Sequence, residues 1–286
     1  MAFAMPISYN QMTLQKIIGS KGFVNSFASV VDVPDGPHVG AITCTVLSAA
    51  VPAAITEATM VTNLAVTVEV ALTWVDTQLT MSLKPSQAKS FFTKPENLVK
   101  LSKNHADGFC YAATGAMLAD MYAATPGFHE HLIDGQMNFI TDGTAAEAHL
   151  NIATLMAAIA YCMSLYQNAS PDDYGIIAYQ TSFANIITLR SEQGYGAIFD
   201  SNANIWRFLG IPIYTTAYAT DFGAASRPAC YVYHKEVGAI AWDEPEIMGG
   251  GPMWHNDAMI KWTTICPYGH AVINAALLAE VMNGAA

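Results

Sequence analysis

The stretch VTNLAVTVEVALTWVDTQLTMSL, residues 61–83, decides the fold of this chain. From Leu64 to Trp74 every second residue is apolar, which is the pattern of a β-strand with one buried face. After Trp74 the apolar positions move by one and continue from Val75 to Leu83. Because a shift of one residue exchanges the two faces of a strand, we predict a bulge or bend at Trp74-Val75.

The length of this segment is as informative as its pattern. Residues 61–83 would span about 75 Å when extended, whereas an ordinary strand has about 5–6 residues. We therefore predict an extended ribbon that leaves the compact body. Its partner strand is predicted at Ile42–Leu47. The small and mostly neutral segment Ser48–Thr59, which contains Pro52, is predicted to form the tip of the hairpin.

A long helix is predicted after the ribbon. Thr93-x-x-Glu96 fits a capping box, Pro95 is tolerated in the first turn, and apolar residues then recur near helical spacing. The predicted helix covers Lys94–Ala124 and is about 46 Å long at 1.5 Å per residue. The run Thr125-Pro-Gly127 ends it.

The segments on either side of this hairpin and helix differ in character. Residues 1–40 are predicted to be an arm rather than a domain, because a short helical pattern at Thr13–Ile18 is followed by the turn-rich segment Pro34–Gly40. After the long helix the chain alternates between predicted helices and strands. These elements are a helix at Thr144–Tyr166, a strand at Tyr174–Tyr179, a helix at Thr181–Arg190, a strand at Ile205–Thr215 that is broken by Gly210 and Pro212, and a strand at Tyr231–Trp242.

The chain is poor in charge. Charged residues make up 12% of it, where about 25% is usual in soluble domains, and its mean hydropathy is positive. The most apolar stretch, Ala148–Tyr166, is interrupted by His149 and Asn151 and follows the capping box Thr144-x-x-Glu147, so we predict a buried helix and no membrane span. We expect no secretory signal peptide. So few charges indicate that copies of the chain cover one another.

Acidic residues concentrate in the middle of the chain. Residues 104–189 contain eight of them and no Lys or Arg, within a chain whose formal net charge is −11. Proteins that bind nucleic acids need clustered cations to contact phosphates. We therefore predict that the chain does not bind DNA tightly or specifically.

No motif in the sequence predicts a catalytic, cofactor-binding or metal-binding residue. His129-Glu130-His131 and Gly249-Gly-Gly251 are interpreted as loops, and Gly194-Tyr-Gly196 does not complete a dinucleotide-binding motif. The acidic pairs Asp172-Asp173 and Glu244/Glu246 lie at turn signals and are interpreted as caps or solvated turns. The five cysteines form no CxxC motif and are predicted to be reduced thiols of the core: Cys44, Cys110, Cys162, Cys230 and Cys266.

The order of these parts resembles that of the major capsid proteins of tailed phages with the Hong Kong 97-type (HK97-like) fold. In that family an N-terminal arm, a long hairpin, a long helix and an α/β region follow one another. Three segments of the second half are similar to family segments: YGIIAYQTSFANIITL (174–189), a strand then a helix; NIWRFLGIPIYTT (204–216), a turn then a strand; and ACYVYHKEVGAIAW (229–242), a strand with a histidine before an Ala-hydrophobic-Ala run. The resemblance implies an α+β capsid fold.

The resemblance also implies a division into domains. It assigns residues 1–40 to the N-terminal arm, 41–83 to the extended β-hairpin (E-loop) and its return strand, 84–143 with about 246–266 to the peripheral domain around a long spine helix, and 144–245 with about 267–286 to the α/β axial domain. Some relatives begin with a removable scaffolding segment, and the type member cross-links through an E-loop lysine. This chain begins with the arm and has no Lys or Arg between Lys21 and Lys84, so we expect separate scaffolding and carry no cross-link over.

The function implied by the resemblance is structural and not enzymatic. We expect a subunit that self-assembles into hexamers and pentamers of an icosahedral phage capsid around packaged dsDNA, made in the host cytoplasm and located in the virion. Its expected partners are other copies of itself and separate scaffolding, portal and decoration proteins, with no membrane and no cofactor. We expect contacts between subunits at Ala49, Pro52 and Thr59 in the hairpin tip and at Trp74.

Two alternatives stay open at this point. One is the shell of a cellular compartment of the encapsulin type. The other, which is less favoured, is a cytoplasmic α/β enzyme with His129 and His131 as metal ligands.

Overall fold

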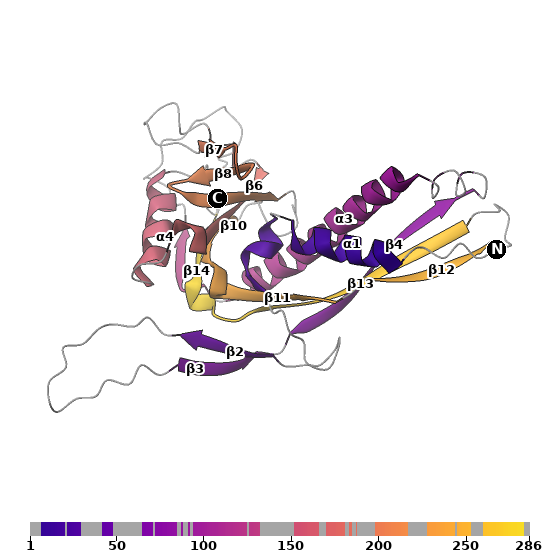
Figure 1. Cartoon of the computed structure of the whole chain (residues 1–286). Helices are drawn as coiled ribbons and strands as arrows, with labels where there is room; N and C mark the ends of the chain where they lie inside the picture. Colours follow the sequence, from indigo (N-terminus) through magenta and orange to yellow (C-terminus); the bar gives the residue numbers. More distant parts are fainter. Residues whose placement is uncertain are drawn as a thin grey trace.

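The computed structural model describes residues 7–20, 22–29, 42–47, 65–70, 72–84, 87, 91, 94–124, 126–131, 152–165, 170–180, 183–184, 187, 198–216, 228–243, 245–252 and 260–282. The body is elongated (Figure 1). A five-stranded sheet and one long helix extend to one side, a seven-stranded sheet stands at the other end, and a two-stranded ribbon lies apart from both.

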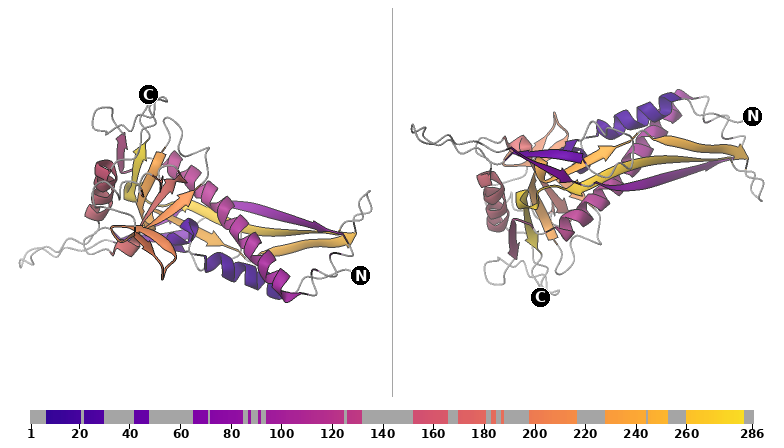
Figure 2. Two further views of the ribbon diagram at one scale, coloured as in Figure 1. Left: turned by 90° about the horizontal axis from the view of Figure 1, so that it is seen from above. Right: turned by 90° about the horizontal axis from the view of Figure 1, so that it is seen from below.

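The extended half consists of α3 (Pro95–Ala123) lying along the five-stranded sheet (Figure 2). The long strand β13 is central to this sheet. It pairs on one side with β4 and on the other with β11 and β12, and β1 adds to β11. The strands are β1 (Ala28–Ser29), β4 (Thr73–Leu83), β11 (Gly238–Trp242), β12 (Glu246–Pro252) and β13 (Ile260–Val272).

The seven-stranded sheet has the order β5-β14-β10-β6-β9-β8-β7. Its strands are β5 (Phe128–His131), β6 (Tyr174–Tyr179), β7 (Ile198–Asp200), β8 (Ile205–Phe208), β9 (Ile211–Thr216), β10 (Pro228–His234) and β14 (Leu278–Met282). Parallel pairs (β5 with β14, β6 with β9) and antiparallel pairs are mixed. Three short 3₁₀ turns accompany them: η2 (Pro171–Asp173), η3 (Lys235–Val237) and η4 (Ala275–Leu277).

Both faces of this sheet are covered. Helix α4 (Ile152–Leu165) packs on one face, and the second half of α3 packs on the other together with the 3₁₀ helix η1 (Phe23–Ser26). Five of the six residues of β6 are buried as a result, because a strand enclosed on two sides exposes neither row of side chains. The buried strand predicted at Tyr174–Tyr179 is confirmed with the same bounds.

Helix α1 (Ile7–Ile18) is packed against α3. Tyr9, Thr13 and Ile17 are fully buried, and their spacing of four residues places them on one side of the helix. The ammonium group of Lys16 donates to the carbonyl of Val99 at 2.6 Å. Residues 7–29 thus contribute to the core of the body, whereas the sequence predicted an arm over 1–40 that leads into a domain.

The segment predicted as one long strand forms two strands in different sheets. Strand β3 (Ala65–Val70) pairs only with β2 (Ile42–Leu47) among the described strands, whereas β4 pairs with β13. No bulge lies at Trp74-Val75, because the pairing of β4 with β13 runs without a shift over all eleven residues; the chain instead changes sheet slightly earlier, between Val70 and Thr73. The change of phase has another cause: Trp74 packs on one face of the sheet and Val75 on the other, so both faces are partly buried here.

Three further sequence interpretations are corrected. The run predicted as one strand at Tyr231–Trp242 is β10 and β11, which turn at η3 and enter different sheets. The strand at Ile205–Thr215, predicted with breaks at Gly210 and Pro212, is a hairpin of β8 and β9: the break at Gly210 is confirmed, the chain reverses there because Leu209 and Gly210 adopt positive φ angles of 51° and 84°, and Pro212 lies within β9. The presumed loops at His129–His131 and Gly249–Gly251 are parts of β5 and β12, because ladder pairing with neighbouring strands outweighs their local preferences.

The long helix agrees with its prediction to within one residue at each end. Its N-cap is Lys94, whose side chain makes no capping hydrogen bond, and Thr93 of the predicted capping box lies outside the described residues. Helix α4 falls within the predicted Thr144–Tyr166, and the first eight residues of that range also lie outside the described part.

Candidate assembly surfaces

The ribbon formed by β2 and β3 has two rows of unlike composition. In an antiparallel pair, directly opposed positions share a face of the ribbon. One row consists of apolar pairs only, and the other is mostly polar. The apolar pairs are Ile42–Val70, Cys44–Val68 and Val46–Val66, and the others are Thr43–Glu69, Thr45–Thr67 and Leu47–Ala65. A two-stranded ribbon is marginally stable in water by itself, so we expect a ribbon with this pattern to pack against another surface.

Among the residues predicted to contact other subunits, Trp74 is described. It is half-buried, lies four residues after the end of β3, and stands opposite Gly269 of β13. A Cβ atom on Gly269 would come within 3.1 Å of the Trp74 ring and 3.0 Å of Leu72, so these side chains fill a close-packed joint within the subunit. Ala49, Pro52 and Thr59 lie outside the described residues, and their contact role stays a prediction.

The second half of α3 is fastened to β13 by a buried histidine. His270 Nδ1 lies 2.6 Å from Asp120 Oδ2, and the His270 side chain is buried whereas that of Asp120 is about one-third exposed. Burial raises the pKa of the adjacent Tyr268 phenol, with a smaller contribution from the Asp120 charge. This contact fixes the rotation of α3 relative to the sheet that carries it.

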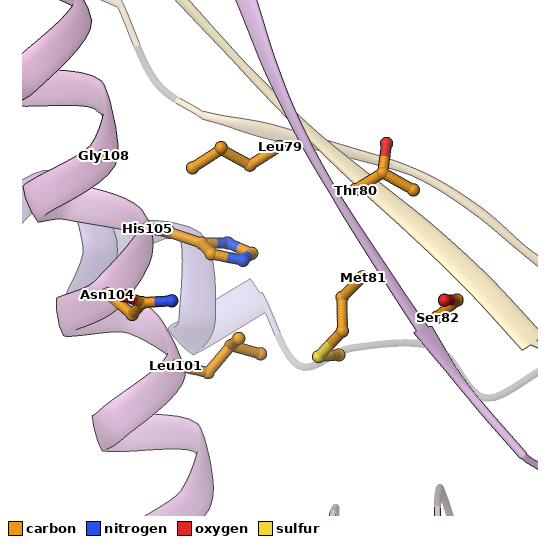
Figure 3. Close-up of a pocket in the computed structure, with 8 residues that line it drawn as sticks. All are labelled: Leu79, Thr80, Met81, Ser82, Leu101, Asn104, His105 and Gly108. Carbon is orange, nitrogen blue, oxygen red and sulfur yellow. The ribbon is translucent and has the colours of Figure 1, made fainter.

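The first half of α3 borders a cavity of about 490 Å³ between the helix and β4 (Figure 3). The cavity is lined by Leu79, Thr80, Met81, Ser82, Leu101, Asn104, His105 and Gly108.

His105 Nδ1 lies 2.5 Å from Tyr9 Oη, and burial raises the pKa of Tyr9 to about 12. Burial also lowers the pKa of His105. None of the described residues that line the cavity is a carboxylate, and the hydrogen bond between Tyr9 and His105 joins α1 to α3.

The described cations of the seven-stranded half are held in ion pairs. Lys235 lies 2.5 Å from Asp173, and Arg207 reaches Asp172 at 2.5 Å and Asp200 at 3.3 Å. The hydrogen bond from Lys235 is the main reason why the pKa of Asp173 is lowered. The pKa of Asp200 is also lowered, chiefly because its carboxylate accepts hydrogen bonds from the backbone N–H groups of Ala203 and Asn202. The acidic pair Asp172-Asp173 therefore serves as a cap and as partners of two cations, which agrees with the interpretation as a turn.

Large apolar side chains are exposed on this half, and sequence reasoning did not find them. On α4, Met156 is 36% exposed and Met163 42%. On the strands, Ile198 is 65% exposed, Phe199 45% and Leu209 49%. The sequence did contain a sign that α4 has an exposed apolar side. The segment IATLMAAIAYCMSL has no charged residue, and a helix that is apolar on all sides is normally enclosed on all sides. Short strands such as β7 give no comparable signal.

The four cysteines with described side chains are free thiols, as predicted: Cys110, Cys162, Cys230 and Cys266. Burial raises the pKa of Cys162, Cys230 and Cys266 to about 12, so these three are unreactive near neutral pH.

Within the described ranges, no group of three His, Cys, Asp or Glu residues is arranged to hold a metal ion. In the same part of the chain, no helix combines the length and apolar character that a membrane span needs.

Comparison with known proteins gives similarity in structure only. No family model matches the sequence, and no curated protein matches it. The capsid of an empty GTA particle has a TM-score of 0.56 at 12% identity, over 93% of this chain and 91% of that one. The capsid of Ralstonia phage GP4 has a TM-score of 0.55 at 10% identity, and the match covers 91% of this chain and 87% of that one. A virus-like particle from Pyrococcus furiosus has a TM-score of 0.51 at 10% identity, and the match covers 96% of this chain and 97% of that one. The chain has the α+β fold of these shell proteins, which confirms the fold that the order of elements predicted.

Proposed function

We propose that this chain is the structural subunit of an icosahedral phage capsid, which assembles into hexamers and pentamers around packaged dsDNA. The observation that carries the proposal is the ribbon of β2 and β3. Six apolar residues stand opposite one another in its ladder, and the ribbon pairs with no other described strand. The fold supports the proposal, because similarity to capsid structures extends over nearly the whole chain.

In this proposal each part of the chain has a role in the shell. The ribbon is the E-loop, whose apolar row lies on a neighbouring subunit. Helix α3 is the spine helix of the peripheral domain (residues 84–143 with about 246–266), and the seven-stranded sheet with α4 is the core of the axial domain. The tip residues Ala49, Pro52 and Thr59 contact the neighbour, and Trp74 holds the base of the ribbon.

The proposed partners and location follow from this role. Copies of the chain are the main partner, and scaffolding, portal and decoration are supplied by separate proteins. The genome is enclosed without tight or specific contacts, since residues 104–189 contain no Lys or Arg and the two described cations of the seven-stranded half, Arg207 and Lys235, are paired with carboxylates. The subunit is made in the host cytoplasm and ends in the virion, and it performs no catalysis.

Two neighbouring positions of β3 provide the test. Val68→Lys places a charge in the apolar row of the ribbon, and Thr67→Lys places the same charge in the other row. Both positions lie on β3, which pairs with β2 and with no strand of the two larger sheets in the described part of the chain, so circular dichroism of both variants should match the wild type. Sedimentation should show shells for Thr67→Lys and only free capsomers or subunits for Val68→Lys. Equal assembly of the two variants would contradict the role given to the ribbon.

A second candidate is a shell that encloses protein cargo, as an encapsulin does. The structure of a virus-like particle from Pyrococcus furiosus, which is similar over 96% of this chain and is not described as a phage capsid, keeps this candidate open. The content of shells isolated from the native source separates the two candidates. We expect nuclease-protected double-stranded DNA, whereas a packed cargo protein without DNA would support the second candidate instead.

A further inference from the structure

The ribbon of β2 and β3 is joined to the body over a very short piece of chain. Strand β3 ends at Val70 and β4 begins at Thr73. Leu72 lies between them and belongs to neither the ladder of the ribbon nor the ladder of β4 with β13. Its side chain is 6% exposed, although the ribbon itself lies apart from both larger sheets (Figure 1). A buried leucine at this point ties the end of the ribbon to the body.

Leu72 packs into a hollow that four small residues leave in the five-stranded sheet. Ala239 is paired with Ala271, and Ala241 with Gly269, in the ladder of β11 with β13. Directly opposed positions share a face of a sheet, as do positions two apart on one strand, so the four small residues lie together on one face. Leu72 forms one apolar cluster with the three alanines. We call the four small residues the socket.

The fit between Leu72 and the socket is close. A Cβ atom on Gly269 would lie 3.0 Å from Leu72 Cδ1 and 3.2 Å from Leu72 Cβ, so the leucine occupies the space that a side chain at position 269 would need. Alanine and glycine are depleted in strands, and glycine inside a strand often marks the close approach of another segment. Four small residues side by side in two paired strands therefore indicate a sheet that is shaped to receive this leucine.

The socket lies on the face of the sheet that α3 does not cover. Ile240 and Tyr268 alternate with the socket residues along β11 and β13 and thus lie on the other face. Both belong to the core cluster that includes Met117 and Leu118 of α3, whereas Leu72 belongs to a separate cluster. Helix α3 is therefore held on the sheet by residues other than Leu72.

We infer that Leu72 is a positioning residue, whose side chain in the socket fixes the direction in which the ribbon leaves the body. This inference rests on the proposed function, in which the ribbon lies on a neighbouring copy. Trp74 is already held by the ladder of β4, where it stands opposite Gly269. Leu72 precedes that ladder, so its packing in the socket is what orients the chain between the ribbon and β4.

A small change of angle at the socket becomes large at the far end of the ribbon. Strand β3 has six residues, which span about 20 Å when extended. A tilt of about 15° at its base would move the far end by about 5 Å. Apolar side chains are in contact only when their heavy atoms lie within about 4.0–4.5 Å of each other. Loss of Leu72 from the socket would therefore be enough to take the ribbon out of contact with a neighbouring copy.

Distances between two spin labels in the unassembled full-length subunit test the inference. A ketone-bearing amino acid in place of Thr67 of β3 and in place of the exposed Lys103 of α3 carries the labels, so the native thiols stay unlabelled. The otherwise unchanged chain should give one narrow distance distribution. Leu72→Ala empties the socket and should broaden this distribution by about 5 Å or more. Leu72→Met nearly keeps the volume and should keep the narrow distribution. An equal width for Leu72→Ala and the unchanged chain would overturn the inference.

A matched control separates the positioning of the ribbon from stability. Leu155 of α4 is fully buried in the core of the seven-stranded half, so Leu155→Ala should lower the Tm at least as much as Leu72→Ala does. It should leave the distance distribution narrow and, well below its Tm, give the wild-type yield of shells, whereas Leu72→Ala should give fewer.

The outcomes for the inference and for the proposed function are distinct. If Leu72→Ala and Leu155→Ala assemble equally well, the ribbon needs no positioning by Leu72, and the inference is overturned while the proposed function stands. If the wild-type chain forms no shell, the proposed function is overturned, and the spin-label distances still decide whether Leu72 holds the ribbon.

Discussion

Substitution of Gly175 by alanine should strongly destabilise the subunit, because the position has no room for a side chain. Gly175 of β6 stands opposite Tyr233 of β10, and a Cβ atom there would lie 2.4 Å from both Cζ and Oη of the tyrosine. The ring cannot move aside easily. It is 1% exposed and stacks on Phe27 with 5.1 Å between ring centroids.

The hydrogen bond of Tyr233 adds to the cost. Ser26 Oγ donates to the carbonyl of Phe23 and lies 2.7 Å from Tyr233 Oη, so the phenol donates to Ser26. Overpacking of a filled core costs about 1–3 kcal/mol. Displacement of the ring would also break the bond to Ser26, which is worth about 1 kcal/mol. We therefore expect Gly175→Ala to lower the free energy of unfolding by about 2–4 kcal/mol.

Urea unfolding of the unassembled subunit measures this change, and two variants serve as controls. Gly22→Ala should shift the free energy of unfolding by less than about 0.5 kcal/mol, since the nearest atom to a Cβ there is 3.7 Å away. In a Tyr233→Leu background the ring is gone, so adding Gly175→Ala should cost much less than it does in the wild type. Equal costs in the two backgrounds, or a wild-type midpoint for Gly175→Ala, would refute the reasoning.

Three further predictions concern the joint, pH and DNA. Trp74→Asp places a charge in the packed joint beside Gly269 and should lower the free energy of unfolding by about 2 kcal/mol, with a loss of particles; a normal particle yield would contradict it. Burial lowers the pKa of His105 and His234 below the ordinary 6.5, so the folded state binds fewer protons than the unfolded one. Stability should be complete above pH 6.5 and fall as the pH drops below it, and urea midpoints at pH 7.5 and 5.5 check the sign. Free subunits should shift duplex DNA only weakly in a gel at moderate salt, and micromolar or tighter binding would be the contrary result.

The strongest periodic patterns of the sequence were sufficient to predict where individual helices and strands begin and end. The helix at Pro95–Ala123 and the strands at Ile42–Leu47 and Tyr174–Tyr179 were predicted with nearly the observed bounds, because each has a continuous pattern with clear ends. Strand partners were not predictable in the same way. The pattern of Val61–Leu83 reports which positions are buried and not which sheet buries them, so β3 and β4 were read as one strand.

Candidate contact surfaces were predicted less completely. Trp74 lies four residues after the end of β3 and packs within the subunit, and its predicted contact with other subunits stays a prediction. Met156 and Met163 were missed because hydropathy marks α4 as apolar without telling which of its sides the subunit itself covers. Leu209 was missed because its positive φ is a property of the turn that joins β8 to β9, whereas the sequence indicated a break in one strand at Gly210 and Pro212 and no reversal of the chain.

Electron microscopy of the purified full-length chain in negative stain tests the central claim most directly. If the chain is a shell subunit, the images should show closed icosahedral particles, with hexameric and pentameric rings wherever shells are incomplete. A population of monomers or of one small discrete oligomer, unchanged over a range of salt and protein concentration, would contradict the account.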